Sequence, residues 1–217
     1  NGQRRVVIMA NVRGRDLGSF AEAVQAKVGA KIKLPIGYHL EYSGTYEQLK
    51  SGKVRLMIAV PLTFVAVFIL LMLTLGNFRH ALLVFTGIPF AVSGGILALF
   101  VRQMPFSISA GVGFIALAGI AVLNGLVMVT FINSLKVTSA SLEEAIISGA
   151  QARIRPVLMT AFVASLGFVP MAVATGSGAE VQKPIATVVI GGLFTATILT
   201  LIVLPVVYRL IHRQDMK

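Results

Sequence analysis

Two patterns of hydrophobic and polar residues divide this chain near residue 53. Before that point, apolar positions alternate with polar ones or recur every four residues, as in a water-exposed domain. After it, long apolar runs follow one another with only short polar connectors. The change predicts a small polar domain at residues 1–50, a membrane bundle at residues 54–211 and a short tail at residues 212–217.

The first domain is predicted to contain a strand, a helix and a second strand. Residues 4–13 and 38–44 alternate in polarity, which is typical of half-buried strands. Between them, residues 16–33 carry an apolar residue at every fourth position, which predicts an amphipathic helix. A unit of this size buries little core, so we expect this α+β fragment to complete its sheet with strands from a longer chain.

Five apolar runs approach the roughly 20 residues that cross about 30 Å of hydrocarbon. They are residues 54–75, 80–101, 107–134, 155–175 and 184–211. Kinks or breaks are predicted at the prolines within these runs, because proline lacks the helical N–H and its ring collides with the preceding turn. These prolines are Pro61, Pro89, Pro170 and Pro205. The predicted fold is an all-α membrane bundle of five transmembrane helices, preceded by the α+β fragment.

A shorter helix is predicted between the third and fourth runs, at residues 139–152. Ser141 and Glu144 have the spacing of a capping box, and a modest apolar stripe follows them. This combination is typical of a helix that lies at the membrane surface.

The composition supports a membrane protein and excludes several other classes. Hydrophobic residues make up 56% of the chain and charged residues 12%, and the mean hydropathy is +0.87; a soluble domain would carry about twice that charged fraction. The absence of cysteine excludes disulfides and thiolate metal sites. Although the net charge is +11, no aromatic-basic platform accompanies it, so we expect lipid rather than nucleic acid as the partner.

The basic residues also predict an orientation. If residues 1–50 lie outside, the inner connectors and the tail contain seven Lys or Arg residues, and the outer connectors contain two, Arg102 and Lys183. The inner seven are Arg79, Lys136, Arg153, Arg155, Arg209, Arg213 and Lys217. Because Lys and Arg are enriched on the cytoplasmic side, the amino-terminal domain is predicted outside and the carboxyl terminus inside. Arg209 and His212, near a span end, are expected to reach the headgroups.

The centres of the predicted spans contain no ionisable side chain, so this sequence alone holds no carboxylate relay for protons. Asn124 is the polar residue in the middle of the third run. Its amide either joins two helices or bonds a carboxylate on another helix and tunes its pKa. Thr130, six positions later, could extend such a polar line, and so could Thr195, Thr197 and Thr200, although threonine often bonds its own backbone.

Small residues spaced four apart predict close helix packing, at Ala121 and Gly125 and again at Gly192 and Ala196. His39 and Glu41 could share one face of a strand and hold a cation, but an exposed polar face is the simpler interpretation. No cofactor is predicted and the metal ligands are unknown. We find no nucleophile-base pair or phosphate loop of an enzyme.

Several motifs nevertheless resemble one known family. "RIRPVLMTA", "GFVPMA", "TGSGAE" and "GGLFTATILTLIVLPVVY" are similar to the carboxyl-terminal bundle of resistance-nodulation-division (RND) efflux pumps. "NVRGRDLGSF" is similar to the heavy-metal branch, the CzcA-like cation pumps. The resemblance covers essentially the whole chain.

The resemblance implies that residues 1–50 close a periplasmic porter subdomain and that the five runs are the last five of twelve helices. It further implies a homotrimer in the bacterial inner membrane, with a periplasmic adaptor and an outer-membrane channel, that exports cations by proton influx. The relay acids of such pumps lie on a helix of the other half, which Asn124 would face. Leu123 occupies the position of a Lys in drug pumps and of an acid in copper and silver pumps, so divalent cobalt, zinc, cadmium or nickel fits better.

Two other classes stay open. One is an RND transporter of drugs or other substrates with the same bundle. The other is a truncated membrane remnant or scaffold that does not transport. Because the chain starts at Asn1 without Met or a signal region, we expect a piece of a longer protein.

Overall fold

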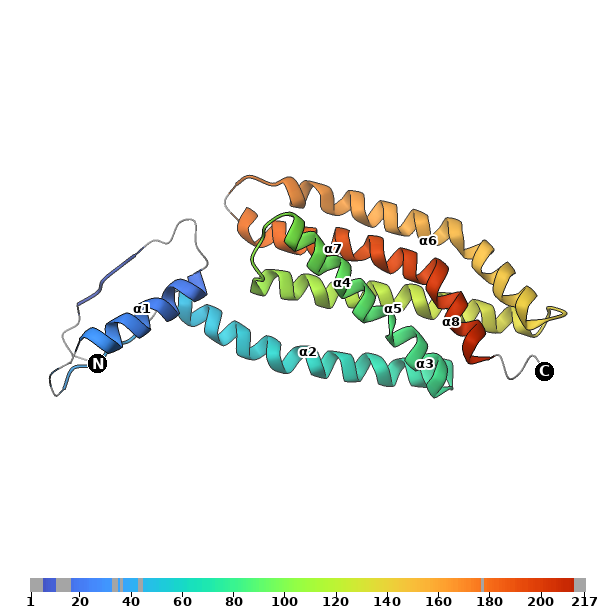
Figure 1. Cartoon of the computed structure of the whole chain (residues 1–217), viewed down its shortest axis with the longest axis horizontal. Helices are drawn as coiled ribbons and strands as arrows, with labels where there is room; N and C mark the ends of the chain where they lie inside the picture. The colour runs from blue at the N-terminus through green and yellow to red at the C-terminus, as the bar shows by residue number, and fades with distance from the viewer. Residues whose placement is uncertain are drawn as a thin grey trace. The chain divides into compact units, whose positions relative to one another are not determined.

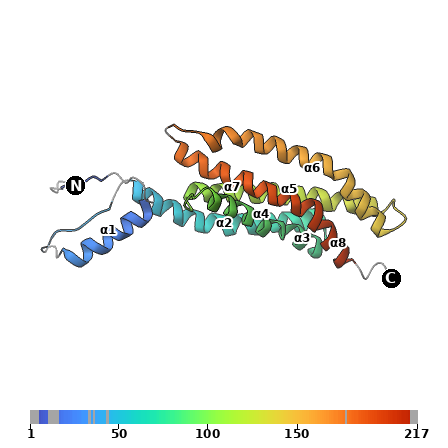
Figure 2. The same cartoon turned by 45° about the horizontal axis from the view of Figure 1, so that its top comes forward.

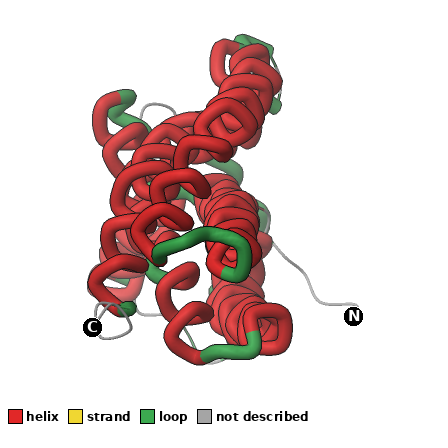
Figure 3. The backbone as a smooth tube through the Cα atoms, turned by 90° about the vertical axis from the view of Figure 1, so that its right-hand side faces the viewer, coloured by secondary structure: helices red, strands yellow, loops and turns green. Residues whose placement is uncertain are grey.

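The structure is a computed structural model that describes residues 6–10, 17–32, 35, 37–42, 45–176 and 178–212. It separates into two compact units, Asn1–Arg55 and Leu56–Lys217. The described parts of the chain are helices joined by loops (Figure 3).

The first unit contains the predicted amphipathic helix, α1, at Leu17–Lys31. The predicted strands are not found in its described residues, since 6–10 and 38–42 have no regular structure. A strand requires a neighbouring strand for its backbone N–H and C=O groups, and residues 6–10 are exposed. The remaining residues of the two predicted strands lie outside the described ones.

Among the described residues, the prediction of five apolar helices long enough to cross a membrane is confirmed. The candidate spans are Val54–Leu75, Phe78–Val101, Ile108–Lys136, Leu142–Val173 and Ala179–Ile211. The elements that form them are α2 (Thr45–Leu75), α3 (Phe78–Phe85), α4 (Gly87–Val101), α5 (Ile108–Lys136), α6 (Leu142–Val173), α7 (Ala179–Ile198), the π-helical turn η1 (Leu199–Val203) and α8 (Leu204–Ile211).

Two of the four span prolines coincide with interruptions. Thr86 separates α3 from α4 three residues before Pro89, and η1 ends two residues before Pro205. In both cases the proline ring would collide with the carbonyl four residues earlier in a regular helix. Pro61 and Pro170, by contrast, lie inside the continuous helices α2 and α6.

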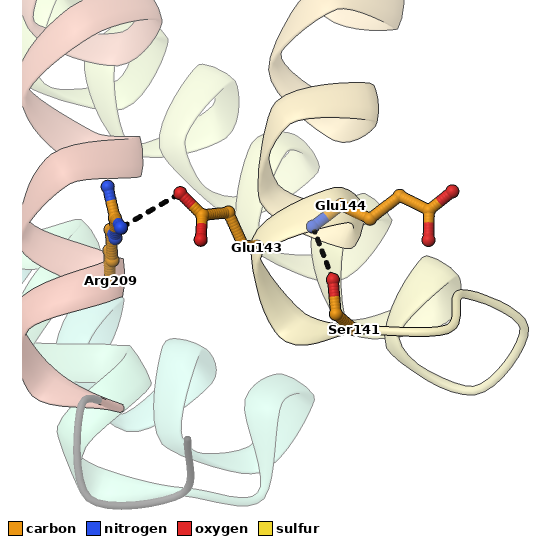
Figure 4. A network of polar contacts seen from close by, with 4 residues as sticks. All are labelled: Ser141, Glu143, Glu144 and Arg209. Carbon is orange, nitrogen blue, oxygen red and sulfur yellow. Dashed lines mark hydrogen bonds and ion pairs between the residues drawn. The ribbon is translucent and has the colours of Figure 1, made fainter. Parts of the chain in front are cut away.

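Helix α6 differs from the predicted pair of helices. It runs unbroken from Leu142 to Val173 and so joins most of the proposed surface helix (139–152) to most of the fourth apolar run (155–175). Pro156 lies within α6. The predicted cap is present at Ser141, because the Glu144 N–H donates to Ser141 Oγ at 3.2 Å (Figure 4). The return bond of a capping box is shifted by one residue, since Glu144 Oε2 accepts from the Ala140 N–H at 3.2 Å.

The centre of the membrane unit is formed by α4, α5 and α7, and α6 lies along α7 (Figures 1 and 2). Two groups of buried apolar side chains hold these helices together. The outer helices α2 and α6 bury only 6% and 11% of their most apolar windows, whereas the other spans bury 44–56%. The large apolar surfaces of α2 and α6 are therefore available to lipid or to further helices.

Within the membrane unit, α2 contacts α3 through aromatic side chains. The Phe68 ring meets the Phe78 and Phe85 rings edge to face, with centroids 5.7 and 5.3 Å apart. Phe64 meets Phe85 in the same way at 6.2 Å. Such edge-to-face pairs are a favoured aromatic geometry and add to the stabilisation from burial.

Candidate functional site

Asn124 lies in the middle of α5 and is half-buried. Within the described part of the chain its side chain has no hydrogen-bond partner. The structure thus gives no support to the interpretation that Asn124 joins two helices of this bundle. An amide in hydrocarbon needs partners, so Asn124 is left with the capacity to bond a group outside the described residues.

The threonines mostly bond their own helices. The Thr130 hydroxyl donates to the Leu126 and Val127 carbonyls at 2.8 and 3.1 Å. Thr197 and Thr200 do the same one turn back along α7 and η1. Thr195 also reaches across, because its hydroxyl donates to the Phe90 carbonyl of α4 at 3.1 Å. No continuous polar line joins these side chains to Asn124 among the described residues.

The predicted small residues lie at helix contacts. Ala121 of α5 and Ala196 of α7 share one buried cluster. A Cβ atom on Gly192 would collide with the Leu117 side chain and would lie 2.8 Å from the Ala91 carbonyl oxygen. Gly125 packs against the Val84 side chain, 3.0 Å from the position of a Cβ atom.

A pair of glycines brings α4 and α7 still closer together. A Cβ atom on Gly94 would lie 2.7 Å from the Gly191 carbonyl oxygen, and one on Gly191 would lie 2.9 Å from the Gly94 carbonyl oxygen. Any side chain at either position would therefore push the two backbones apart. The α4–α7 contact is a backbone-to-backbone approach of the kind that small residues permit in membranes.

Arg102, which follows the last residue of α4, joins α4 to α6 and α7. Its Nη1 donates to Thr187 Oγ1 of α7 at 2.7 Å, and its Nη2 donates to the Ala172 carbonyl of α6 at 2.9 Å. The sequence marked this residue only as a charge in a connector. In the structure it is a clamp that fixes the end of α4 to α6 and α7.

A second polar cluster joins α3, α5 and α8 where α3 begins and α8 ends. His80 Nε2 lies 3.0 Å from His212 Nε2, and both side chains are buried. The Tyr208 hydroxyl donates to Asn133 Oδ1 at 2.6 Å, and Asn133 Nδ2 lies 3.5 Å from His80 Nδ1. The Tyr208 ring stacks against both imidazoles, with centroids 5.4 Å from His80 and 4.3 Å from His212, and the two imidazole centroids lie 5.0 Å apart.

This cluster corrects the expectation that His212 reaches the headgroups. The fully buried Tyr208 ring offers the His212 imidazole an apolar face, so it packs inward. The predicted topology contained a signal for the cluster, because it put residues 80, 133 and 212 at span ends on one side of the membrane. The sequence pattern did not give the rotation of each helix about its axis, which determines whether these side chains face one another.

Near the same end, α6 and α8 are linked by an ion pair. Arg209 Nη2 lies 2.8 Å from Glu143 Oε1, and both side chains are about half-exposed (Figure 4). Exposed pairs of this kind contribute about 0–1 kcal/mol. The pair orients the start of α6 but adds little stability.

The described residues contain no group of three or more His, Asp or Glu side chains that could hold a metal ion. His39 and Glu41, the pair considered from the sequence, are both exposed and lie on a segment without strand structure. The sequence-based proposal of a cation site there stays a prediction without support from the geometry.

Comparison with known proteins finds relatives that match almost the whole chain. The sequence model of the AcrB/AcrD/AcrF family matches residues 1–212. The chain is 60% identical over 215 residues to the cobalt-zinc-cadmium resistance protein CzcA of Cupriavidus metallidurans, which covers 99% of this chain and 20% of that protein. It is 53% identical to the nickel-cobalt-cadmium resistance protein NccA of Alcaligenes xylosoxydans xylosoxydans, over 100% of this chain and 20% of that protein.

The fold is also similar to a solved structure. The crystal structure of a heavy metal efflux pump superimposes with a TM-score of 0.78 at 41% sequence identity, covering 94% of this chain and 20% of the pump. The chain thus spans about one fifth of the length of the relatives that it matches.

Proposed function

Because the chain belongs to the AcrB/AcrD/AcrF family of RND transporters, we propose that it forms the carboxyl-terminal membrane bundle of a proton-driven exporter of heavy-metal cations. The observation that carries this proposal is the 60% identity to a cobalt-zinc-cadmium resistance protein over 99% of the chain. Divalent cobalt, zinc, cadmium or nickel is the proposed substrate class, since the names of the relatives CzcA and NccA specify resistance to these metals.

In this proposal the bundle responds to protonation and does not itself carry the proton-binding acids. The described spans have no carboxylate near Asn124, whose amide has unused hydrogen-bonding capacity. A carboxylate on a helix outside this chain would be the partner, and the Asn124 amide would favour its charged form. Protonating that acid would release the amide and change the packing of α5. The Thr130 hydroxyl already donates to the Leu126 carbonyl of its own helix, so Thr130 would be only a secondary neighbour of that acid.

The remaining parts of the proposal follow the family. Residues 1–50 would contribute to a periplasmic porter domain, and the carboxyl terminus would lie in the cytoplasm, in accord with the positive-inside rule. The protein would act as a homotrimer in the inner membrane with an adaptor and an outer-membrane channel. A transporter of this family moves its substrate without transforming it, so no catalytic residue is assigned.

The test of Asn124 uses the native polypeptide that contains this sequence, expressed in a metal-sensitive bacterium. Asn124→Leu should reduce zinc, cobalt or cadmium resistance at equal protein levels, because leucine cannot hydrogen-bond the relay acid. Removing a charge-assisted hydrogen bond costs roughly 1.5–3 kcal/mol, or about a tenfold loss or more.

The matched control is Thr63→Val, which also removes a polar group from a span. The Thr63 hydroxyl bonds its own helix, at the Ala59 carbonyl, so its loss should leave resistance unchanged. Equal resistance in the Asn124→Leu strain and its parent would reduce Asn124 to a structural residue. Resistance to dyes in place of metals would favour the drug-transporting alternative.

A further inference from the structure

In the polar cluster of α3, α5 and α8, the chemistry of the side chains determines which atom donates and which accepts in each hydrogen bond. The Tyr208 carbonyl can only accept, so His212 Nδ1, 3.0 Å away, carries a proton. When His212 is neutral, its Nε2 is consequently an acceptor. Asn133 Oδ1 already accepts from the Tyr208 hydroxyl, so Asn133 turns its Nδ2 donor toward His80 Nδ1.

His80 Nδ1 is then an acceptor, and the His80 proton lies on Nε2. It points at the lone pair of His212 Nε2, 3.0 Å away. With both rings neutral, the four side chains form one chain of hydrogen bonds in which each of these contacts has a donor and an acceptor. This matching of donors and acceptors requires no metal ion. The two imidazoles would in any case supply only two of the four ligands of a tetrahedral zinc site.

We propose that His80 and His212 are a proton-binding latch that holds α3 to α8 while at least one ring is neutral and releases them when both are protonated. One added proton binds at His80 Nδ1 and ends its contact with the Asn133 Nδ2 donor, but the His80 Nε2–H still donates to His212 Nε2, so the hydrogen bond between the rings persists. A second proton places two N–H groups and two positive charges against each other. The contact between the rings must then open.

Among the described residues, the surrounding charges do not offset a doubly protonated pair. The positive charge of Lys136 on α5 acts on His80, and Arg79 is the exposed neighbour of His80 on α3. Of the carboxylates on α6, Glu143 pairs with Arg209 of α8, and Glu144 caps its own helix. The part of α2 in this unit, residues 56–75, has no titratable side chain.

The latch would make the packing of α8 depend on pH. Histidine is the side chain whose ordinary pKa of about 6.5 falls in the physiological range. The α3–α8 contact is therefore closed at neutral and alkaline pH and opens as the pH falls far enough to charge both rings. This inference does not rest on metal export, and its test measures helix separation rather than transport.

The test is the distance between nitroxide labels on α3 and α8, measured by electron paramagnetic resonance. Leu82 and Leu210 are exposed, so each is replaced by cysteine in the native polypeptide, with other cysteines of that polypeptide removed. The segment itself contains no cysteine to interfere. In lipid vesicles, the distance should be short and narrowly distributed at about pH 8 and longer and broader at about pH 5.

His80→Gln should abolish this change and keep the short distance at both pH values, because a single remaining imidazole cannot form a doubly charged pair. His39→Gln is the matched control, since His39 is exposed and belongs to the other unit; it should retain the full pH response. The same distance at both pH values in the unsubstituted protein would overturn the proposal, as would a pH response that survives in His80→Gln.

A second measurement guards against a His80→Gln variant that does not fold. In the unsubstituted polypeptide, amide hydrogen exchange in α8, corrected for the intrinsic effect of pH, should accelerate on acidification. The central helix α7 should not change. Equal protection of α8 at both pH values would also contradict the latch.

Discussion

At the scale of single residues, Gly192 gives the sharpest test of helix packing. A Cβ atom there would collide with the Leu117 side chain and press on the Ala91 carbonyl. We predict that Gly192→Ala lowers the free energy of unfolding by about 1–3 kcal/mol, the usual cost of an overpacked core. Thermal unfolding of the purified native polypeptide in detergent measures the change.

The matched control is Gly119→Ala on α5, because a Cβ atom at Gly119 meets nothing within 4 Å. Alanine is the better helix former by roughly 0.5–1 kcal/mol, so this variant should be as stable as the parent or slightly more so. If both variants unfold at the same temperature, the close packing of Gly192 against Leu117 of α5 and Ala91 of α4 is wrong.

The sequence predicted these small residues well and the polar partners less well. Spacing alone brings Gly192 and Ala196 to one face of a helix, so their place at a contact follows from helical geometry. The partner of a hydroxyl does not follow from spacing, since Thr195 reaches Phe90 across the helix contact and Thr197 bonds its own backbone. Which one occurs depends on helix rotation, which the tertiary packing sets.

At the scale of elements, the side chains that fix the helix ends contribute unequally to the free energy of unfolding. Arg102 makes two charge-assisted hydrogen bonds to α6 and α7, whereas Arg209 makes a half-exposed ion pair. We predict that Arg102→Ala destabilises the bundle by roughly 1–3 kcal/mol and Arg209→Ala by about 0–1 kcal/mol. Chemical unfolding of the two variants side by side checks the difference.

The two arginines are controls for each other, since each substitution removes the same side chain and charge. Equal losses would mean that the Arg102 clamp contributes no more than a surface charge. A larger loss for Arg209→Ala would contradict this ranking of the two contacts.

The apolar runs predicted the five spans, because the thickness of a bilayer fixes a minimum length. Helix continuity was harder to predict. Pro170 was among the predicted kinks or breaks, yet α6 continues through it, whereas the chain does interrupt its regular helix near Pro89 and Pro205. Proline removes one hydrogen bond in every case, and the surrounding packing decides whether the helix bends or breaks.

At the scale of the whole molecule, the described part of the bundle leaves much apolar surface and one polar side chain without partners. The outer helices α2 and α6 bury 6% and 11% of their most apolar windows. The chain spans about one fifth of its relatives, and a half-buried amide in α5 has no partner in the described residues. These features fit a transporter whose proton-binding groups lie on other helices.

The central claim is proton-driven export of a divalent metal, and transport in reconstituted vesicles tests it most directly. The native polypeptide is placed in liposomes that enclose a zinc-sensitive dye, and a pH gradient is imposed. The account predicts zinc movement opposite to the proton flow that stops when an ionophore removes the gradient. Zinc movement that ignores the gradient, or transport of dyes without any of metal, would contradict it.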